Sequence, residues 1–105
     1  MEEYLILTTR HEDMFFGGYA HLFWGPNKSG YTAILQRAGL YTKEEAYKIV
    51  DEDDIPIHIS KIGLDRSVFE QKTDGIIQTP ILFLKTEYAK SLIDDWKYEY
   101  RRRTK

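Results

Sequence analysis

The 105-residue sequence contains no cysteine, which excludes disulfides, thiolate nucleophiles and zinc–thiolate sites. It also lacks any apolar run near the ~20 residues that a membrane-spanning helix requires. The chain begins Met1-Glu2-Glu3, without the basic segment that opens a signal peptide. These absences predict a protein of the cytoplasm that has no membrane partner.

Neither sign of charge dominates the composition. The chain has 15 Lys and Arg residues against 17 Asp and Glu residues, a formal net charge of −2 at pH 7. This balance argues against a surface devoted entirely to nucleic acid. Locally, residues 51–54 are acidic and the C-terminus is basic. The hydrophobic share of 42% and the aromatic share of 14% are typical of a folded chain, and the length suits one domain.

The hydrophobic pattern predicts a small α+β domain, with a mainly antiparallel sheet packed by a short central helix and a long C-terminal helix. Within a single domain spanning 1–105, residues 1–62 are expected to form a β-meander plus a helix, and residues 63–105 an extension ending in an amphipathic helix. Apolar, β-branched and alternating segments predict strands at 4–9, 19–24, 31–32 and 55–59. The last of these is an edge strand, only partly protected by its proline from pairing with another chain.

Two helices have clear N-terminal signals. The run from Thr42 to Glu45 is a capping box, so a helix is expected from Lys43 to about Asp51. Thr86 is the expected cap of the longest helix, whose apolar stripe is Ala89, Leu92, Ile93, Trp96 and Tyr100.

Two further segments connect these elements. Residues 80–84 are expected to be extended and buried. For 64–79 two structures are open: a short helix capped by Asp65, or a hairpin that turns at Asp74-Gly75. The hairpin, which pairs Val68-Phe69 with Ile76-Ile77, is preferred.

No motif predicts catalysis, a metal or a cofactor. His11, His21 and His58 are scattered, without the helical i, i+4 spacing that favours metal ligation. An acid–base pair would require His11 or His21 to meet His58 across the sheet. The segment 25–30 contains Gly, Lys and Ser but lacks the spacing of a phosphate-binding loop, so we interpret it as a turn.

Aromatic residues crowd the stretch from 15 to 41. Most are expected in the core, but aromatic side chains dominate binding hot spots when they are exposed. Phe15, Phe16 and Trp24 lie next to glycines and are the best candidates for an exposed anchor. The predicted partner-binding residues are Phe15, Phe16, Trp24, Asn27 and Tyr31.

The basic C-terminus offers an alternative site. Cations interleaved with aromatic side chains can bind phosphates and stack on bases, which makes nucleic acid an alternative partner. Asp94, Asp95 and Glu99 lie nearby and argue against this function. The alternative site consists of Lys97, Arg101, Arg102, Arg103 and Lys105.

Five segments carry a resemblance: Tyr4-Leu5-Ile6, Trp24-Gly25-Pro26-Asn27, Gly30-Tyr31-Thr32, Ala38-Gly39-Leu40-Tyr41-Thr42 and Glu44-Glu45-Ala46. Together they resemble a widespread group of short, uncharacterised proteins from phages and other mobile elements, which share a W-x-P-N-x-x-G-Y-T, A-G-x-Y-[ST]-x-E-E-A pattern. The resemblance covers roughly the first half of the chain and implies no activity. It implies a small accessory protein of a phage or prophage, located in the cytoplasm of the host cell.

The first hypothesis is therefore a non-catalytic accessory protein that binds a host protein, for example as an inhibitor of host defence. The aromatic loops would anchor this partner and the acidic stretch 51–54 would steer it. One alternative is nucleic-acid binding through the basic C-terminal helix. The other is a small-ligand-binding domain or enzyme, which would need a pocket where Tyr, His and Arg groups converge.

Overall fold

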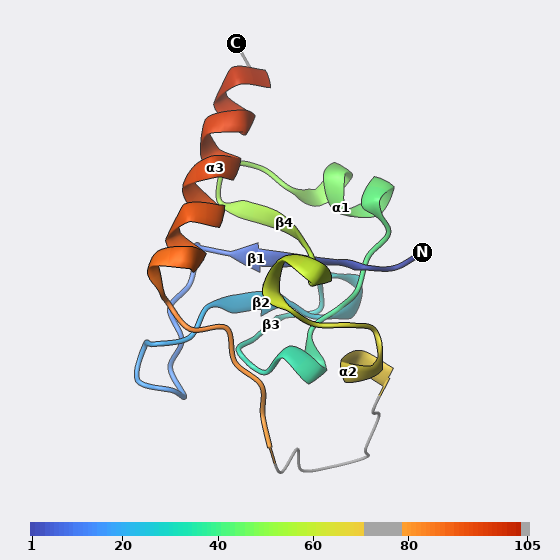
Figure 1. The fold of residues 1–105 in the computed structure, drawn as a ribbon, viewed down its shortest axis with the longest axis vertical. Coiled ribbons are helices and arrows are strands. Elements are labelled where there is room, and N and C mark those ends of the chain that lie inside the picture. Colours follow the sequence, from blue (N-terminus) through green and yellow to red (C-terminus); the bar gives the residue numbers. More distant parts are fainter. Residues whose placement is uncertain (71–78, 104–105) are drawn as a thin grey trace.

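Four antiparallel strands in the order β3-β2-β1-β4 form the sheet at the centre of the fold (Figure 1). The computed structural model describes residues 1–70 and 79–103. The strands are β1 (Tyr4–Thr8), β2 (Leu22–Trp24), β3 (Tyr31–Thr32) and β4 (Asp54–His58). The predicted α+β class and the meander of the first three strands are confirmed.

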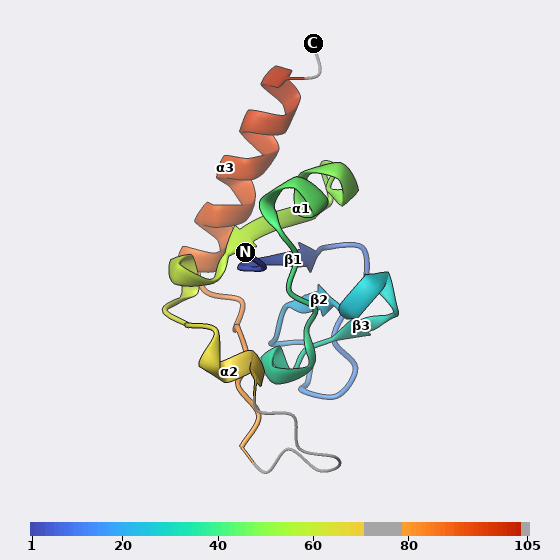
Figure 2. The ribbon, with the colours of Figure 1, turned by 90° about the vertical axis from the view of Figure 1, so that its right-hand side faces the viewer.

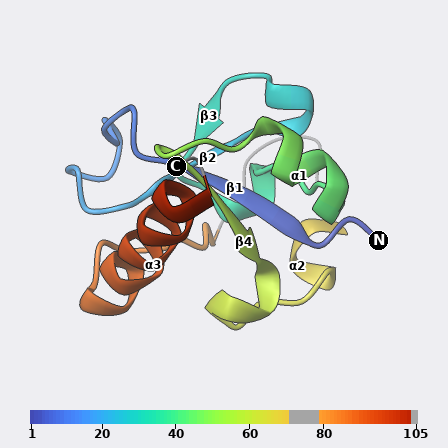
Figure 3. The same ribbon diagram turned by 90° about the horizontal axis from the view of Figure 1, so that it is seen from above.

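Helices cover both faces of this sheet. The α-helices are α1 (Lys43–Ile49), α2 (Ser67–Glu70) and α3 (Glu87–Arg103). Short 3-10 turns are η1 (Pro26–Lys28), η2 (Leu35–Arg37) and η3 (Ile59–Ile62). Seen from above, α1 lies on one side of the central strands, and α2 and α3 lie on the other (Figure 3). In the view of Figure 2, β3 forms the edge of the sheet farthest from α3.

Strand β1 is buried on both faces, as its apolar sequence predicts. Leu5 and Leu7 point into the larger core, which also holds Phe23, Ile55 and Ile57. Ile6 points the opposite way and packs against Tyr41 and Ala46. This alternation follows from the two-residue period of a strand and explains why Leu5, Ile6 and Leu7 are all aliphatic.

Both predicted helix caps are present. Thr42 Oγ1 accepts a hydrogen bond from the Glu45 amide at 3.1 Å, and Glu45 Oε1 accepts one from the Thr42 amide at 2.9 Å. Thr86 Oγ1 accepts from the Ala89 amide at 3.1 Å and caps α3. Ala89 is fully buried. Leu92, Ile93 and Trp96 pack against the larger core, which confirms the predicted apolar stripe on α3.

The preferred hairpin for 64–79 is wrong in its described part. Val68 and Phe69 belong to α2 rather than to a strand, and Asp65 Oδ1 accepts a hydrogen bond from the Ser67 amide at 2.9 Å. The structure therefore has the alternative that the sequence left open, a short helix capped by Asp65. The cap gives an amide at the start of the helix a nearby hydrogen-bond acceptor. The second arm, Ile76-Ile77, lies outside the described residues.

The start of one strand and the burial of segment 80–84 are also corrected. Regular pairing in β2 begins at Leu22, because residues 19–21 pair with residues 83–85 instead. The His21 amide donates to the Phe83 carbonyl and the Lys85 amide donates to the Tyr19 carbonyl, each at 2.9 Å. Segment 80–84 is only partly buried, and Leu84 is 49% exposed.

Candidate functional site

The turn at residues 25–30 is held from beneath by Tyr41, which is buried. The Tyr41 hydroxyl donates a hydrogen bond to the Gly25 carbonyl and accepts one from the Lys28 amide at 3.1 Å. Asn27 and Lys28 both adopt positive φ angles, of 54° and 57°. Burial raises the pKa of the Tyr41 phenol above its ordinary value, so the hydroxyl stays a neutral donor.

Gly39 lets the chain pass directly against this turn. Its amide donates to the Trp24 carbonyl at 2.9 Å. A Cβ atom at Gly39 would lie 2.7 Å from the backbone carbon and oxygen of Gly25, closer than atoms can approach. The residues that carry the sequence resemblance, from Trp24 to Tyr41, therefore interlock as a structural unit.

Trp24 is part of this packing rather than a free anchor. Its ring lies 4.3 Å from the Tyr31 ring, measured between centroids, and it packs against the smaller core around Ile6. Lys28 Nζ lies 5.1 Å from the Trp24 ring centroid on the exposed turn. Tyr31 also contacts His11, with centroids 4.2 Å apart. Of the predicted partner-binding residues, Trp24 is thus half-buried, whereas Asn27 is exposed on the turn.

The segment after β1 is organised by Asp13, a buried carboxylate. Asp13 Oδ1 accepts hydrogen bonds from the amides of Phe15 at 2.8 Å and Phe16 at 3.0 Å. Burial raises the pKa of Asp13, but these bonds and those from the amides of Gly18 and Ala20 outweigh it and hold the pKa below its ordinary value. The Asp13 carboxylate is therefore ionised, and in this form it holds the loop in place.

This loop presents large apolar side chains to solvent. Met14 is 89% exposed and Phe15 is 90% exposed, while Phe16 is half-buried beside them. Gly17 and Gly18 have φ angles of 68° and 81°, a backbone conformation that favours glycine, and they complete the tight return of the chain. The Phe15 side chain is therefore exposed, as predicted, on a loop whose backbone is held by hydrogen bonds to Asp13.

A cavity of about 700 Å³ opens beside this loop. Its volume falls within the roughly 300–1,000 Å³ typical of ligand pockets. Most of its lining is apolar, with polar groups from His11, Glu12, Thr32 and Arg37. Three of the predicted partner-binding residues meet here: Phe15, Phe16 and Tyr31. Met14 also lines this cavity, which we call the edge pocket.

A smaller cavity of about 240 Å³ adjoins the edge pocket, and His11, Glu12 and Leu22 line both. His21 and Lys85 complete its wall. Glu12 Oε2 accepts a hydrogen bond from Lys85 Nζ at 2.6 Å, and this partner lowers the pKa of the Glu12 carboxyl. Burial, reinforced by Lys85 and opposed by Glu12, lowers the pKa of His21 below its ordinary value. His21 is consequently neutral at pH 7.

The third histidine lies elsewhere. His58 contacts the Tyr4 ring at 5.2 Å between centroids, and its Nδ1 lies 2.7 Å from Ser60 Oγ. The structure thus brings His11 and His21 to one cavity but does not bring either to His58. Across 1–70 and 79–103, no group of three or more His, Asp or Glu side chains has the arrangement of a metal site.

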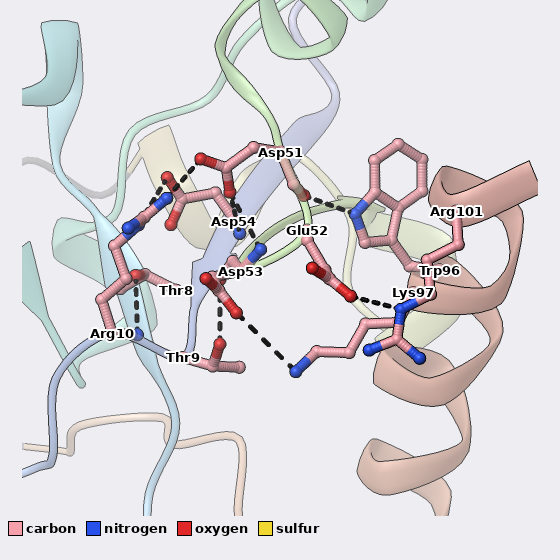
Figure 4. Close-up of polar contacts among 10 residues, drawn as sticks. All are labelled: Thr8, Thr9, Arg10, Asp51, Glu52, Asp53, Asp54, Trp96, Lys97 and Arg101. Carbon is pink, nitrogen blue, oxygen red and sulfur yellow. Dashed lines mark hydrogen bonds and ion pairs between the residues drawn. The ribbon is translucent and has the colours of Figure 1, made fainter. Parts of the chain in front are cut away.

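The basic helix α3 is paired with the acidic stretch before β4 (Figure 4). Lys97 Nζ lies 3.8 Å from Asp53 Oδ1, and Arg101 forms an ion pair with Glu52. The Trp96 indole donates to the Asp51 carbonyl at 2.7 Å, which fixes α3 against this turn. Opposite charges that are separate along the sequence therefore meet in space.

Other charged residues of the acidic stretch and of α3 also form ion pairs or contact an aromatic ring. Arg10 pairs with Asp51 on the other side of the turn, and its Nε lies 3.6 Å from Asp54 Oδ2. Arg102 NH1 lies 3.8 Å from Glu99, and the Arg103 guanidinium lies 5.9 Å from the Tyr47 ring centroid. Lys105 lies outside the described residues. Much of the acidic stretch expected to steer a partner thus serves intramolecular pairs.

Sequence reasoning missed several residues of the edge pocket: Met14, Ile34, Arg37, His11 and Glu12. One signal for the exposed loop was available, because an aspartate followed by three apolar residues and two glycines is typical of a side-chain-capped turn. No comparable signal existed for Ile34 and Arg37, since their place depends on the position of η2 relative to loop 11–16.

Comparisons with protein-family models, with curated proteins and with solved structures each found no match. No helix in the described part of the chain is both long and apolar enough to cross a membrane.

Proposed function

We propose that this protein is a non-catalytic binding protein that captures another protein through the edge pocket. The observation that carries the proposal is the ordered exposure of Met14 and Phe15 beside a cavity of about 700 Å³. In the phage or mobile-element setting that the sequence resemblance implies, the partner is a protein of the host cell.

The loop that carries Phe15 and Phe16 is preorganised for binding. An exposed aromatic side chain contributes most to binding when little conformational freedom is lost on association. The hydrogen bonds from the Phe15 and Phe16 amides to Asp13 restrict the loop before a partner arrives. The cavity next to Phe15 can accept an apolar side chain from the partner, so protruding and concave surfaces lie together.

A small-ligand-binding domain is the second candidate, and one observation favours it. His11, Tyr31 and Arg37 line the edge pocket, which is the convergence of His, Tyr and Arg groups that such a function needs. Few polar groups in a mainly apolar pocket are typical of small-molecule sites. Nucleic-acid binding is less favoured, because Lys97 and Arg101 are paired with carboxylates.

The proposal is tested by affinity capture from nuclease-treated bacterial lysate with wild-type protein and two variants. Met14→Ala/Phe15→Ala removes two exposed side chains and is expected to leave the fold intact while abolishing capture of a specific host protein. Tyr98→Ala is the matched control, because Tyr98 is an aromatic residue that is 64% exposed on α3. Equal capture by all three proteins would rule out the edge pocket as the binding surface.

A further inference from the structure

A small cavity lies over strand β4, which runs between α1 and α3 in Figure 1. Strand β4 is an edge strand in the order β3-β2-β1-β4, so side chains of helices on opposite faces of the sheet can meet around it. The cavity has a volume of about 150 Å³, and an apolar cavity of this size can hold one benzene ring. No described residue lines both this cavity and the edge pocket, so the two are separate. We call it the β4 cavity.

The rings of Tyr4, Tyr47, His58 and Trp96 border the β4 cavity. The Tyr4 ring meets the Tyr47 ring at 79°, with centroids 6.1 Å apart, and the His58 ring at 87° and 5.2 Å. The Tyr47 ring meets the Trp96 ring at 86° and 5.9 Å. In an edge-to-face contact only one of the two rings uses its face. These contacts therefore leave ring faces that a further planar group can contact.

The same rings stay at the surface and are held in place. Tyr47 is 39% exposed, and Tyr4, His58 and Trp96 are half-buried. The hydrogen bond from the Trp96 indole to the Asp51 carbonyl fixes the largest ring. Rings that are ordered before a ligand arrives lose little conformational freedom on binding.

Positive charge surrounds the β4 cavity. Lys61 lines it, and none of its described lining residues is acidic. Lys43 Nζ lies 5.8 Å from the Tyr47 ring centroid, and the Arg103 guanidinium lies 5.9 Å from the same centroid. These cations favour a ligand that carries negative charge beside Tyr47.

Part of the basic C-terminal helix is directed to this cavity. Lys97 and Arg101 pair with the acidic stretch before β4. Arg103 instead shares a face of α3 with Trp96 and Tyr100, because residues three or four apart lie on one side of a helix. The combination of cations and aromatic rings that the sequence places in this helix therefore occurs at the β4 cavity.

We propose that the β4 cavity binds a nucleotide, with the base against the rings of Tyr4, Tyr47 and Trp96 and the phosphate against Lys43 and Arg103. A base has a flat π face that stacks on aromatic side chains, and the cations bind the phosphate. A free nucleotide and a nucleotide within a single strand share this chemistry. The site is additional to the edge pocket and does not depend on capture of a protein there.

Other ligands fit the β4 cavity less well. A quaternary ammonium group would be attracted to the ring faces, but the three cations around the cavity would repel it. An apolar side chain would make no use of these cations. Glu3 Oε2 lies 3.9 Å from His58 Nε2, so this carboxylate accompanies His58, and the phosphate is placed beside Tyr47 instead.

The test uses NMR of the ¹⁵N-labelled full-length protein with three probes: adenosine monophosphate, adenosine, which lacks the phosphate, and ribose 5-phosphate, which lacks the base. We expect adenosine monophosphate to shift the Trp96 indole signal and the amide signals of Tyr47 and Ile57. The Trp24 indole, which does not line the β4 cavity, is the internal reference. Adenosine should bind about tenfold more weakly, and ribose 5-phosphate should leave these signals unchanged.

Two variants separate the base from the phosphate. Tyr47→Leu removes a stacking ring and should weaken binding of adenosine monophosphate about tenfold. Tyr98→Leu is the matched control, because Tyr98 is 64% exposed on α3 and the Arg102 guanidinium lies 5.7 Å from its ring centroid. Lys43→Gln/Arg103→Gln changes only exposed side chains and should weaken adenosine monophosphate while leaving adenosine unaffected.

A short oligoadenylate identifies the source of the nucleotide. Tighter binding than that of adenosine monophosphate would uphold the site for single strands, and equal binding would uphold it for free nucleotides. The proposal is overturned if neither probe shifts the signals of the β4 cavity, or if ribose 5-phosphate binds as well as adenosine monophosphate. Unchanged binding by both Tyr47→Leu and Lys43→Gln/Arg103→Gln would also overturn it. None of these outcomes bears on capture through Met14 and Phe15, which is tested separately.

Discussion

The Asp13 carboxylate accepts a hydrogen bond from the Phe15 amide at 2.8 Å, and through this bond a buried charge sets the position of a residue whose own side chain is 90% exposed. The bond connects sequence neighbours two residues apart, so the loop carries its own source of order. The proposed binding surface depends on this relationship.

Replacing Asp13 by alanine is therefore expected to release the loop without unfolding the sheet. The amides of Phe15 and Phe16 lose their acceptor, so their hydrogen exchange should accelerate to the rate of an open chain. Capture of the partner should weaken because loop ordering must then be supplied on binding. Asp95→Ala, an exposed carboxylate on α3, is the control. Unchanged exchange at Phe15 would contradict the role of Asp13.

Thermal unfolding should show two steps of destabilisation as the pH falls. Burial lowers the pKa of His21, so the folded state binds a proton less readily than the unfolded chain and stability declines below the ordinary histidine pKa of about 6.5. Glu45 also has a lowered pKa, chiefly through the hydrogen bond from the Thr42 amide. Its contribution is complete above the ordinary carboxyl pKa and is lost as the pH falls through the lower folded value.

The share of Glu45 in the second step can be measured with Glu45→Gln, which keeps the capping box but removes the titrating group. This variant should lose less stability than the wild type below about pH 4. Calorimetry or circular dichroism from pH 7 to acid gives the comparison. Superimposable acid profiles for the two proteins would show that Glu45 does not contribute.

Gly39→Ala should be among the most destabilising single substitutions in the chain. The added Cβ would meet the Gly25 backbone at 2.7 Å, and backbone atoms cannot yield as a flexible side chain can. We expect a loss of about 3 kcal/mol in the free energy of unfolding. Gly30→Ala is the control in the turn at residues 25–30, against which Gly39 packs: its Cβ meets nothing within 4 Å, so only its φ of +83° costs energy, about 1–2 kcal/mol. Equal losses measured by urea unfolding would reject the close approach.

The ion pairs of α3 predict weak binding to nucleic acid. Lys97 and Arg101 face Asp53 and Glu52, so contact with phosphates would require these pairs to open. Fluorescence anisotropy with a labelled DNA duplex should show little binding at physiological ionic strength. Tight binding with a steep salt dependence that Lys97→Gln/Arg101→Gln reduces would instead support the basic helix as the site.

The parts of the fold that sequence predicted well depend on local signals. The Thr42 and Glu45 capping box needs only residues three apart, and the burial of β1 follows from its continuous apolar run. The preferred hairpin after Asp65 was wrong because the same short sequence also suited a capped helix, and packing of Phe69 on the larger core accompanies the helix. Local propensity could not separate these alternatives.

The candidate site was predictable only in part, because it is assembled from distant segments. The aromatic and glycine pattern indicated Phe15 and Phe16 as exposed candidates. The same pattern could not show that the Trp24 ring packs against Tyr31, since that contact depends on the β2–β3 register. The pairing of Arg101 with Glu52 likewise joins residues that only the tertiary fold brings together.

The most direct test of the binding surface is photo-crosslinking in bacterial host cells with a benzophenone amino acid at position 15 or, separately, at position 98. Both positions carry exposed aromatic side chains in the wild type, so the probe should disturb neither fold. The account predicts a covalent adduct with one defined host protein from position 15 and none from position 98. No adduct from position 15, or the same adducts from both positions, would contradict it.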